Sequence, residues 1–167
     1  NAYGAFAVRA GADVILQPRF EPEELLQLIE RHRVTHLHMV PTMFHRLLAL
    51  PDEVRAAADT STLRSVIHAA APCPVEVKRR MIEWWGPVIY EYYAATEGGG
   101  AYVKPKDWLL HPGTVGQPFP GSTLKIFDDD GIECPPGEVG EVWMRPIDPN
   151  RKTYRYIGAE AEARDGW

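Results

Sequence analysis

Three features are scarce or missing in this sequence of 167 residues, and each excludes a class of protein. It has only two cysteines, Cys73 and Cys134, without metal-site spacing, so we expect free thiols in a reducing, cytoplasmic compartment. No apolar run approaches the roughly 20 residues of a membrane span, which leaves only peripheral membrane association open. No basic stripe is present and the net charge is −5, so no nucleic-acid partner is indicated.

What the sequence does contain is typical of a globular protein with a core. Apolar residues make up 45% of the chain and charged residues 25%. The chain begins at Asn1 without a methionine and ends at Asp165-Gly166-Trp167, so we expect an internal piece of a longer protein. The composition does not indicate an oligomeric state.

Strands and helices alternate over the first ninety residues. Apolar periodicity predicts helices over residues 1–12, 22–33, 42–50, 52–58 and 75–85. Short apolar runs predict strands over residues 14–16, 34–40, 65–67 and 87–90. This alternation is typical of an α/β fold, a parallel sheet with crossover helices. Ligands of such sheets bind beyond the carboxyl ends of the strands, so we expect the loops at 69–73 and 93–100 to form one site.

The composition changes after about residue 112, where prolines become frequent. Residues 123–127 and 140–144 read as strands around an Asp-Asp-Gly turn, which predicts a small antiparallel, barrel-like β portion. We therefore expect an α/β subdomain over residues 1–111 and a β-rich part over 112–167. The acidic run 128–130 lacks the spaced ligands of a calcium loop, and a hairpin turn explains it better.

The strongest chemical signal lies at residues 90–100, Tyr-Glu-Tyr-Tyr-Ala-Ala-Thr-Glu-Gly-Gly-Gly. Aromatic rings can stack on a flat base, and the hydroxyl of Thr96 can donate to a phosphate oxygen. The carboxylate of Glu97 is a hard ligand suited to Mg²⁺, and the glycines allow positive φ and close ligand approach. The stretch predicts the lip of a nucleotide or acyl-phosphate site; the alternative is a strand that leaves the core through a flexible turn.

Four segments, in sequence order, resemble motifs of the adenylate-forming superfamily, which includes acyl-CoA synthetases, nonribosomal peptide adenylation domains and luciferases. Residues 40–44, Val-Pro-Thr-Met-Phe, resemble its Val-Pro-Thr-x-Phe segment, and residues 68–74, His-Ala-Ala-Ala-Pro-Cys-Pro, resemble its Gly-Gly-Ala-Pro loop. Residues 93–97, Tyr-Ala-Ala-Thr-Glu, resemble its Tyr-Gly-x-Thr-Glu motif, and residues 113–118 its Gly-x-Val-Gly-x-Pro turn. The resemblance covers nearly the whole chain. It implies part of the large N-terminal domain, without the phosphate loop, the ribose-binding Asp or the C-terminal lid domain with its catalytic lysine.

The resemblance also implies roles for individual residues. Thr96 and Glu97 would be catalytic, with Thr96 on the nucleotide phosphate and Glu97 on Mg²⁺. The implied nucleotide-binding residues are Ala70, Ala71, Pro72, Glu91, Tyr92, Tyr93 and Thr96. The implied acyl-binding residues are Tyr3, Ala69, Gly98 and Ala101. Simpler alternatives stay open: Tyr93 as a core aromatic, Glu91 and Tyr92 as ordinary strand residues, and His68 as either a core histidine or part of the site mouth.

The activity implied is that of an AMP-forming acyl-CoA synthetase acting on a small-molecule carboxylic acid, ATP and CoA, with Mg²⁺ at the nucleotide. A fatty acid is favoured because residues 68–74 resemble the loop of fatty-acid ligases. Two alternatives stay open: an adenylation domain that loads a carrier protein, and a catalytically silent nucleotide- or acyl-binding module. We expect these 167 residues alone to be inactive, because the phosphate loop and the lysine domain are missing from them.

Overall fold

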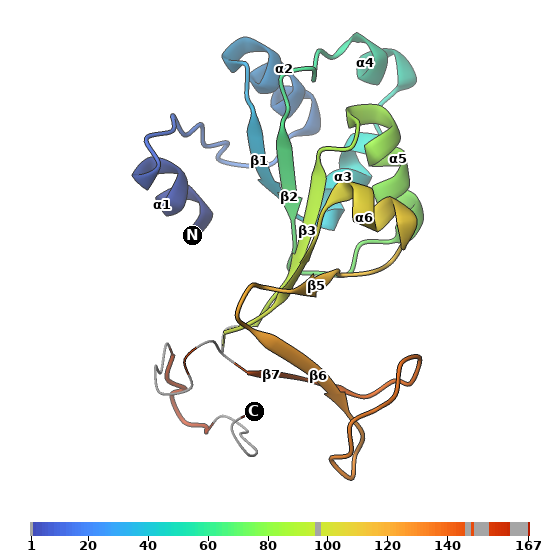
Figure 1. The fold of residues 1–167 in the computed structure, drawn as a ribbon. Coiled ribbons are helices and arrows are strands. Elements are labelled where there is room, and N and C mark those ends of the chain that lie inside the picture. Colours follow the sequence, from blue (N-terminus) through green and yellow to red (C-terminus); the bar gives the residue numbers. More distant parts are fainter. Residues whose placement is uncertain (1, 96–97, 146–147, 149–153, 161–166) are drawn as a thin grey trace. The chain divides into compact units, whose positions relative to one another are not determined.

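The computed structural model describes residues 2–95, 98–145, 148, 154–160 and 167. The contacts divide the chain into two compact units, Asn1–Tyr90 and Glu91–Trp167, which are described separately below (Figure 1). The composition-based division at residues 111 and 112 stays a prediction. The α/β class with a parallel sheet is confirmed, as the strand pairing below shows.

The first unit alternates between helices and strands as predicted. Its elements are α1 (Ala2–Arg9), α2 (Pro22–His32), β1 (His36–Met39), α3 (Pro41–Leu48), α4 (Asp52–Ala57), β2 (Ser65–His68), α5 (Val75–Trp85) and the start of β3 (Ile89–Tyr93). The strand predicted over residues 14–16 was wrong. Leu16 is 76% exposed, and a short apolar run without a partner strand or a buried face gains nothing from strand pairing.

The helix α2 shows why these segments form helices. Pro22 occupies the first turn, where its missing N–H is not needed, and Glu23 and Glu24 oppose the positive end of the helix dipole. Leu26 and Ile29 are buried on one face.

The core of the first unit lies between its strands and helices. β1 and β2 pair in parallel, from His36 opposite Ser65 to Met39 opposite His68. The helices α3 and α5 pack against each other, and both lie on one side of β2 (Figure 1). Large apolar side chains fill the space between these elements and are fully buried: Ile29, Phe44, Leu47, Val66 and Met81.

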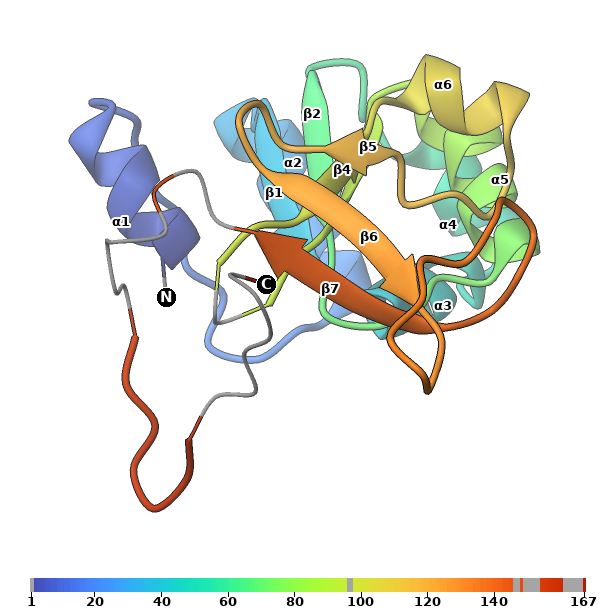
Figure 2. The ribbon, with the colours of Figure 1, turned by 60° about the horizontal axis from the view of Figure 1, so that its bottom comes forward.

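The second unit is built from short antiparallel strands and one helix. It contains most of β3, then β4 (Ala101–Val103), α6 (Pro105–Leu110), β5 (Gln117–Pro118), β6 (Thr123–Phe127) and β7 (Glu141–Arg145). β4 pairs antiparallel with β3 on one side and with β5 on the other. β6 and β7 form a separate two-stranded antiparallel sheet (Figure 2).

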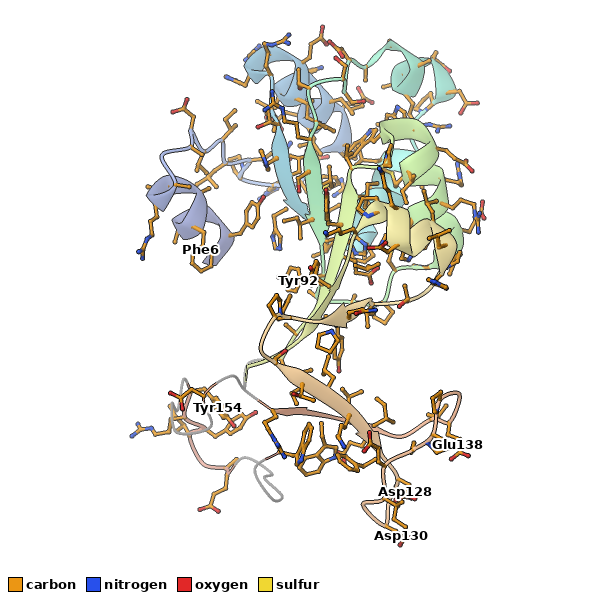
Figure 3. All side chains as sticks on the ribbon, viewed as in Figure 1. Phe6, Tyr92, Asp128, Asp130, Glu138 and Tyr154 are labelled. Carbon is orange, nitrogen blue, oxygen red and sulfur yellow. The ribbon has the colours of Figure 1, made fainter. Side chains whose placement is uncertain are left out.

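The small antiparallel β portion predicted from the sequence is therefore confirmed, although the described residues do not close into a barrel. The hairpin interpretation of the acidic run is confirmed too. The carboxylate of Asp128 accepts backbone N–H bonds from Asp130 at 3.0 Å and from Ile132 at 2.8 Å (Figure 3). Cys73 and Cys134 are both thiols, as expected.

Among the described residues, none of the helices combines the length and the apolar character needed to cross a bilayer.

Candidate active site

The loop between β2 and α5 carries the first group of candidate residues. Ala70, Ala71 and Pro72 are exposed, whereas Ala69 is buried. Ala70 has a φ of 74°, in the left-handed region that a residue with a Cβ rarely adopts. Such a conformation costs roughly 1–2 kcal/mol, so the surroundings must impose it.

His68, the last residue of β2, precedes this loop and is fully buried. Its ring lies edge-on to Phe44, with centroids 5.3 Å apart. Burial, and next the positive charge of Lys78, lower the pKa of His68 to about 3, so the imidazole is neutral near pH 7. Of the two interpretations of His68 given above, that of a core histidine fits its complete burial in the first unit.

β3 and β4 carry the second group of candidates. Tyr93 lies opposite Ala101 in the ladder, and Glu91 lies opposite Val103. Tyr93 is 42% exposed, which does not fit a core aromatic, while Glu91 and Ala101 are buried. Because side chains alternate along a strand, Tyr92 faces the side opposite to Glu91 and Tyr93.

The glycines that follow are held by the protein's own packing. Gly100 has a φ of 146°, and a Cβ there would lie 2.6 Å from the Phe119 ring and 2.5 Å from the carbonyl oxygen of Tyr93. A Cβ on Gly99 would lie 3.1 Å from the Cβ of Met144, on β7. The sequence predicted close approach of a ligand at these glycines, and the structure shows close approach of other protein atoms.

Thr96 and Glu97 lie outside the described residues, so their predicted roles at the phosphate and at Mg²⁺ stay predictions. Gly98 is described with a φ of 108°, and its predicted acyl contact is likewise open. The loops at 69–73 and 93–100, which were expected to form one site, belong to different units. This expectation also stays a prediction.

Tyr3, the remaining acyl candidate, belongs to α1 and stacks on His38 of β1, with ring centroids 4.8 Å apart and an interplanar angle of 18°. Burial raises the pKa of Tyr3, which keeps its hydroxyl protonated near neutral pH, and lowers the pKa of His38. The sequence interpretation did not name His38 as a site residue. The alternation of β1 places His36 and His38 on one face, but the ring contact of His38 with Tyr3 is a tertiary contact that this alternation does not reveal.

The Gly-x-Val-Gly-x-Pro turn has a structural role. Gly116 has a φ of 88°, and a Cβ there would lie 2.8 Å from the Cα of Val103 and closer still to the carbonyl group of Tyr102. Its N–H donates to the hydroxyl of Thr114 at 3.0 Å. The turn therefore brings β5 against the backbone of β4.

Comparison with known proteins places these features in context. Residues 3–147 match the family model described as AMP-binding enzyme. The chain is 32% identical over 164 residues to an indoleacetate–CoA ligase of Aromatoleum aromaticum, and the matched region covers 96% of this chain and 32% of the relative. It is 30% identical over 166 residues to a long-chain-fatty-acid–CoA ligase of Bacillus subtilis, covering 97% and 29%. The chain thus spans about a third of the length of these curated relatives.

Solved structures agree with the fold. An amide bond synthetase of Marinactinospora thermotolerans superposes with a TM-score of 0.71 at 33% identity, over 81% of this chain and 28% of the other. An o-succinylbenzoate CoA synthetase of Bacillus subtilis, in complex with its acyl-adenylate intermediate, gives a TM-score of 0.74 at 26% identity. That match covers 96% of this chain and 32% of the other.

Proposed function

Because the chain belongs to the AMP-binding enzyme family, we propose that the whole protein is an AMP-forming acyl-CoA synthetase. A carboxylate oxygen of the acid attacks the α-phosphorus of ATP, and pyrophosphate leaves. The thiol sulfur of CoA then attacks the acyl carbonyl carbon of the adenylate, AMP leaves, and the thiol proton is lost to solvent. The observation that carries the proposal is the similarity to CoA ligases over nearly the whole chain.

The proposed nucleotide contacts come from both candidate segments. The exposed residues Ala70, Ala71 and Pro72 would run along the adenine, and the ring of Tyr93, a residue that is 42% exposed, would offer a stacking face. Thr96 would donate to a phosphate oxygen. Glu91, which is buried on the same face of β3 as Tyr93, would line the pocket beside it, and the half-buried Tyr92 would support the strand from the opposite face.

The side chain of Glu97 is chemically suited to bind Mg²⁺. Glu97 supplies the hard carboxylate oxygen that Mg²⁺ prefers when the remaining ligands are phosphates and water. The bound ion would neutralise phosphate charge.

The acid is proposed to lie against Tyr3, Ala69, Gly98 and Ala101. A fatty acid is the proposed substrate, supported by the loop at 68–74 and by the similarity to a long-chain-fatty-acid–CoA ligase. The similarity to an indoleacetate–CoA ligase makes an aromatic acid the natural comparison in a test. We propose a cytoplasmic location for the protein.

Exchange of labelled pyrophosphate into ATP tests the adenylation step. The intact protein is assayed with a panel of short, long and aromatic acids, with Glu97→Ala as the control variant. We expect acid-dependent exchange, strongest with aliphatic acids. If no acid supports exchange while ATP still binds, the protein is a silent nucleotide-binding module.

The acceptor needs its own test, because a similar structure is an amide bond synthetase. The preformed adenylate is offered free CoA, a carrier protein with its pantetheine arm, or a primary amine. We expect thioester formation with CoA to be fastest. Faster transfer to the carrier protein or to the amine would identify that molecule, and not CoA, as the acceptor. The proposed adenylation step would be unaffected by this result.

A further inference from the structure

A groove lies between α2 and α4 of the first unit. It has a volume of about 360 Å³ and is lined by residues of both helices. The two helices lie at the same end of this unit (Figure 1). The lining contains none of the residues that carry the proposed nucleotide, metal and acyl contacts. The proposed function therefore leaves this groove without a role.

The floor of the groove is apolar. Leu26 of α2 is only 4% exposed, and Val54 and Ala57 line the groove from α4. Because the side chain of Ala57 is a single methyl group, α4 leaves open the space that a larger residue would fill. An apolar side chain of a partner would gain free energy by displacing water from this floor.

The rim of the groove is acidic. Its carboxylates belong to Glu23 and Glu30 of α2 and to Glu53 of α4, and all three residues are exposed. No lysine, arginine or histidine is among the residues that line the groove. Within the part of the chain that the structure describes, none of these three carboxylates takes part in an ion pair. Charge complementarity therefore calls for an occupant with positive charge.

The spacing of the carboxylates suits a helix as the occupant. Glu23 and Glu30 are seven residues apart on α2, which places them on one side of the helix and about 10.5 Å apart along its axis. A partner helix with basic residues at positions i and i+7 repeats this spacing. Its positions i+3 and i+4 lie between the two charges on the same face, where apolar side chains can enter the groove.

We propose that the groove between α2 and α4 is a docking site for a basic amphipathic helix of a partner protein. Leu26, Val54 and Ala57 receive its apolar side chains, and the three rim carboxylates pair with its lysines or arginines. A small hydrated cation would gain nothing from the apolar floor, and an uncharged apolar segment would bury carboxylates without a partner. The proposal does not depend on the adenylation activity.

A synthetic peptide tests the proposal on the intact protein. Its central sequence is Lys-Ala-Ala-Leu-Leu-Ala-Ala-Lys within an alanine-rich helix, and fluorescence anisotropy measures its Kd. The rim variant removes the charges and keeps the side-chain shape, with the substitutions Glu23→Gln, Glu30→Gln and Glu53→Gln. The control variant removes the same number of charges at exposed positions outside the groove, with Glu76→Gln, Glu83→Gln and Glu138→Gln.

We expect the rim variant to bind the peptide about tenfold more weakly, because each of three exposed ion pairs contributes about a twofold change in affinity. The control variant should stay within about twofold of the wild type. A peptide with serine in place of both leucines should also bind the wild type about tenfold more weakly, because the floor then loses its apolar contact. Absence of binding, equal losses in the two variants, or equal affinity for the serine peptide overturns the proposal.

Carbodiimide cross-linking locates the peptide without any variant, so it decides the question even if a variant misfolds. We expect mass spectrometry to find peptide lysines joined to Glu23, Glu30 and Glu53; cross-links spread over other carboxylates overturn the proposal. A second copy of the chain is the competing occupant, and sedimentation equilibrium addresses it. We expect the rim variant and the wild type to have the same oligomeric state, and self-association that the rim variant abolishes would assign the groove to a dimer contact instead.

Discussion

Alanine substitutions at Gly116 and at Gly137 separate the free-energy cost of backbone strain from that of steric overlap. These two costs usually occur together, and Gly137 provides the matched position at which only the first applies. Both glycines have positive φ, 88° and 97°, and both belong to the second unit. A Cβ on Gly137 meets nothing within 4 Å, whereas a Cβ on Gly116 overlaps the backbone of β4. Gly137→Ala therefore reports backbone strain alone, and Gly116→Ala reports strain plus overlap.

The expected magnitudes follow from these surroundings. Strain costs about 1–2 kcal/mol, of which about 0.4–1 kcal/mol is returned by the lower entropy of the unfolded chain, so Gly137→Ala should lose about 1 kcal/mol. For Gly116→Ala, the overlap with β4 adds about 1–3 kcal/mol. The short β4–β5 ladder, Ala101 with Pro118 and Tyr102 with Gln117, should open and add about 1 kcal/mol more.

Urea denaturation of the intact protein measures the loss of stability, and hydrogen exchange of residues 101–103 locates it. We expect Gly116→Ala to be about 3 kcal/mol less stable than Gly137→Ala, and its β4 amides to exchange more than a hundredfold faster. Equal losses in the two variants, with β4 still protected, would refute the reasoning.

Three further predictions concern single side chains. Glu97→Ala in the intact protein should lower pyrophosphate exchange by about a hundredfold or more, and an unchanged rate would remove Glu97 from the proposed metal site. Trp108→Ala should cost about 3–5 kcal/mol in urea denaturation because Trp108 is 1% exposed, whereas Leu110→Ala, 74% exposed on the same helix, should change stability by less than about 0.5 kcal/mol. The pKa of His68 is lowered to about 3, so below pH 6.5 the unfolded chain binds a proton that the folded chain does not. The free energy of unfolding should therefore fall by up to about 1.4 kcal/mol per pH unit from pH 6.5 toward pH 3. The variant His68→Gln should show a smaller slope in urea denaturation over the same pH range.

The longer helices of the fold could be predicted from the sequence. The helix predicted over residues 75–85 has those same bounds, because its buried residues recur at helical spacing and Pro74 precedes it. β4 and α6 were missed, because a three-residue strand has no measurable periodicity and α6 has only six residues. The apolar run at 14–16 was predicted as a strand but is exposed, since pairing depends on a neighbour that the local sequence does not reveal.

The candidate site, like the fold, could be predicted from the sequence only in part. The family resemblance implied a ligand-facing surface at residues 70–72 and at Tyr93, and these residues are exposed. The left-handed backbone of Ala70 could not be predicted, because a residue with a Cβ rarely adopts it. The close approach of Met144 to Gly99 could not be predicted either, because the two residues are distant in the sequence. Motif spacing indicates which chemistry is present, whereas the supporting contacts are a property of tertiary packing.

The pairing of Tyr93 with Ala101 has a consequence for how substrate preference can change. The proposed nucleotide contact and the proposed acyl contact are cross-strand partners, and Ala101 is only 2% exposed. A larger side chain at position 101 would press on the ladder and displace Tyr93, so altered acid choice there would come with weakened ATP affinity. Divergence toward new acids should therefore accumulate at positions outside this strand pair, and laboratory libraries that leave Ala101 unchanged should retain more active members.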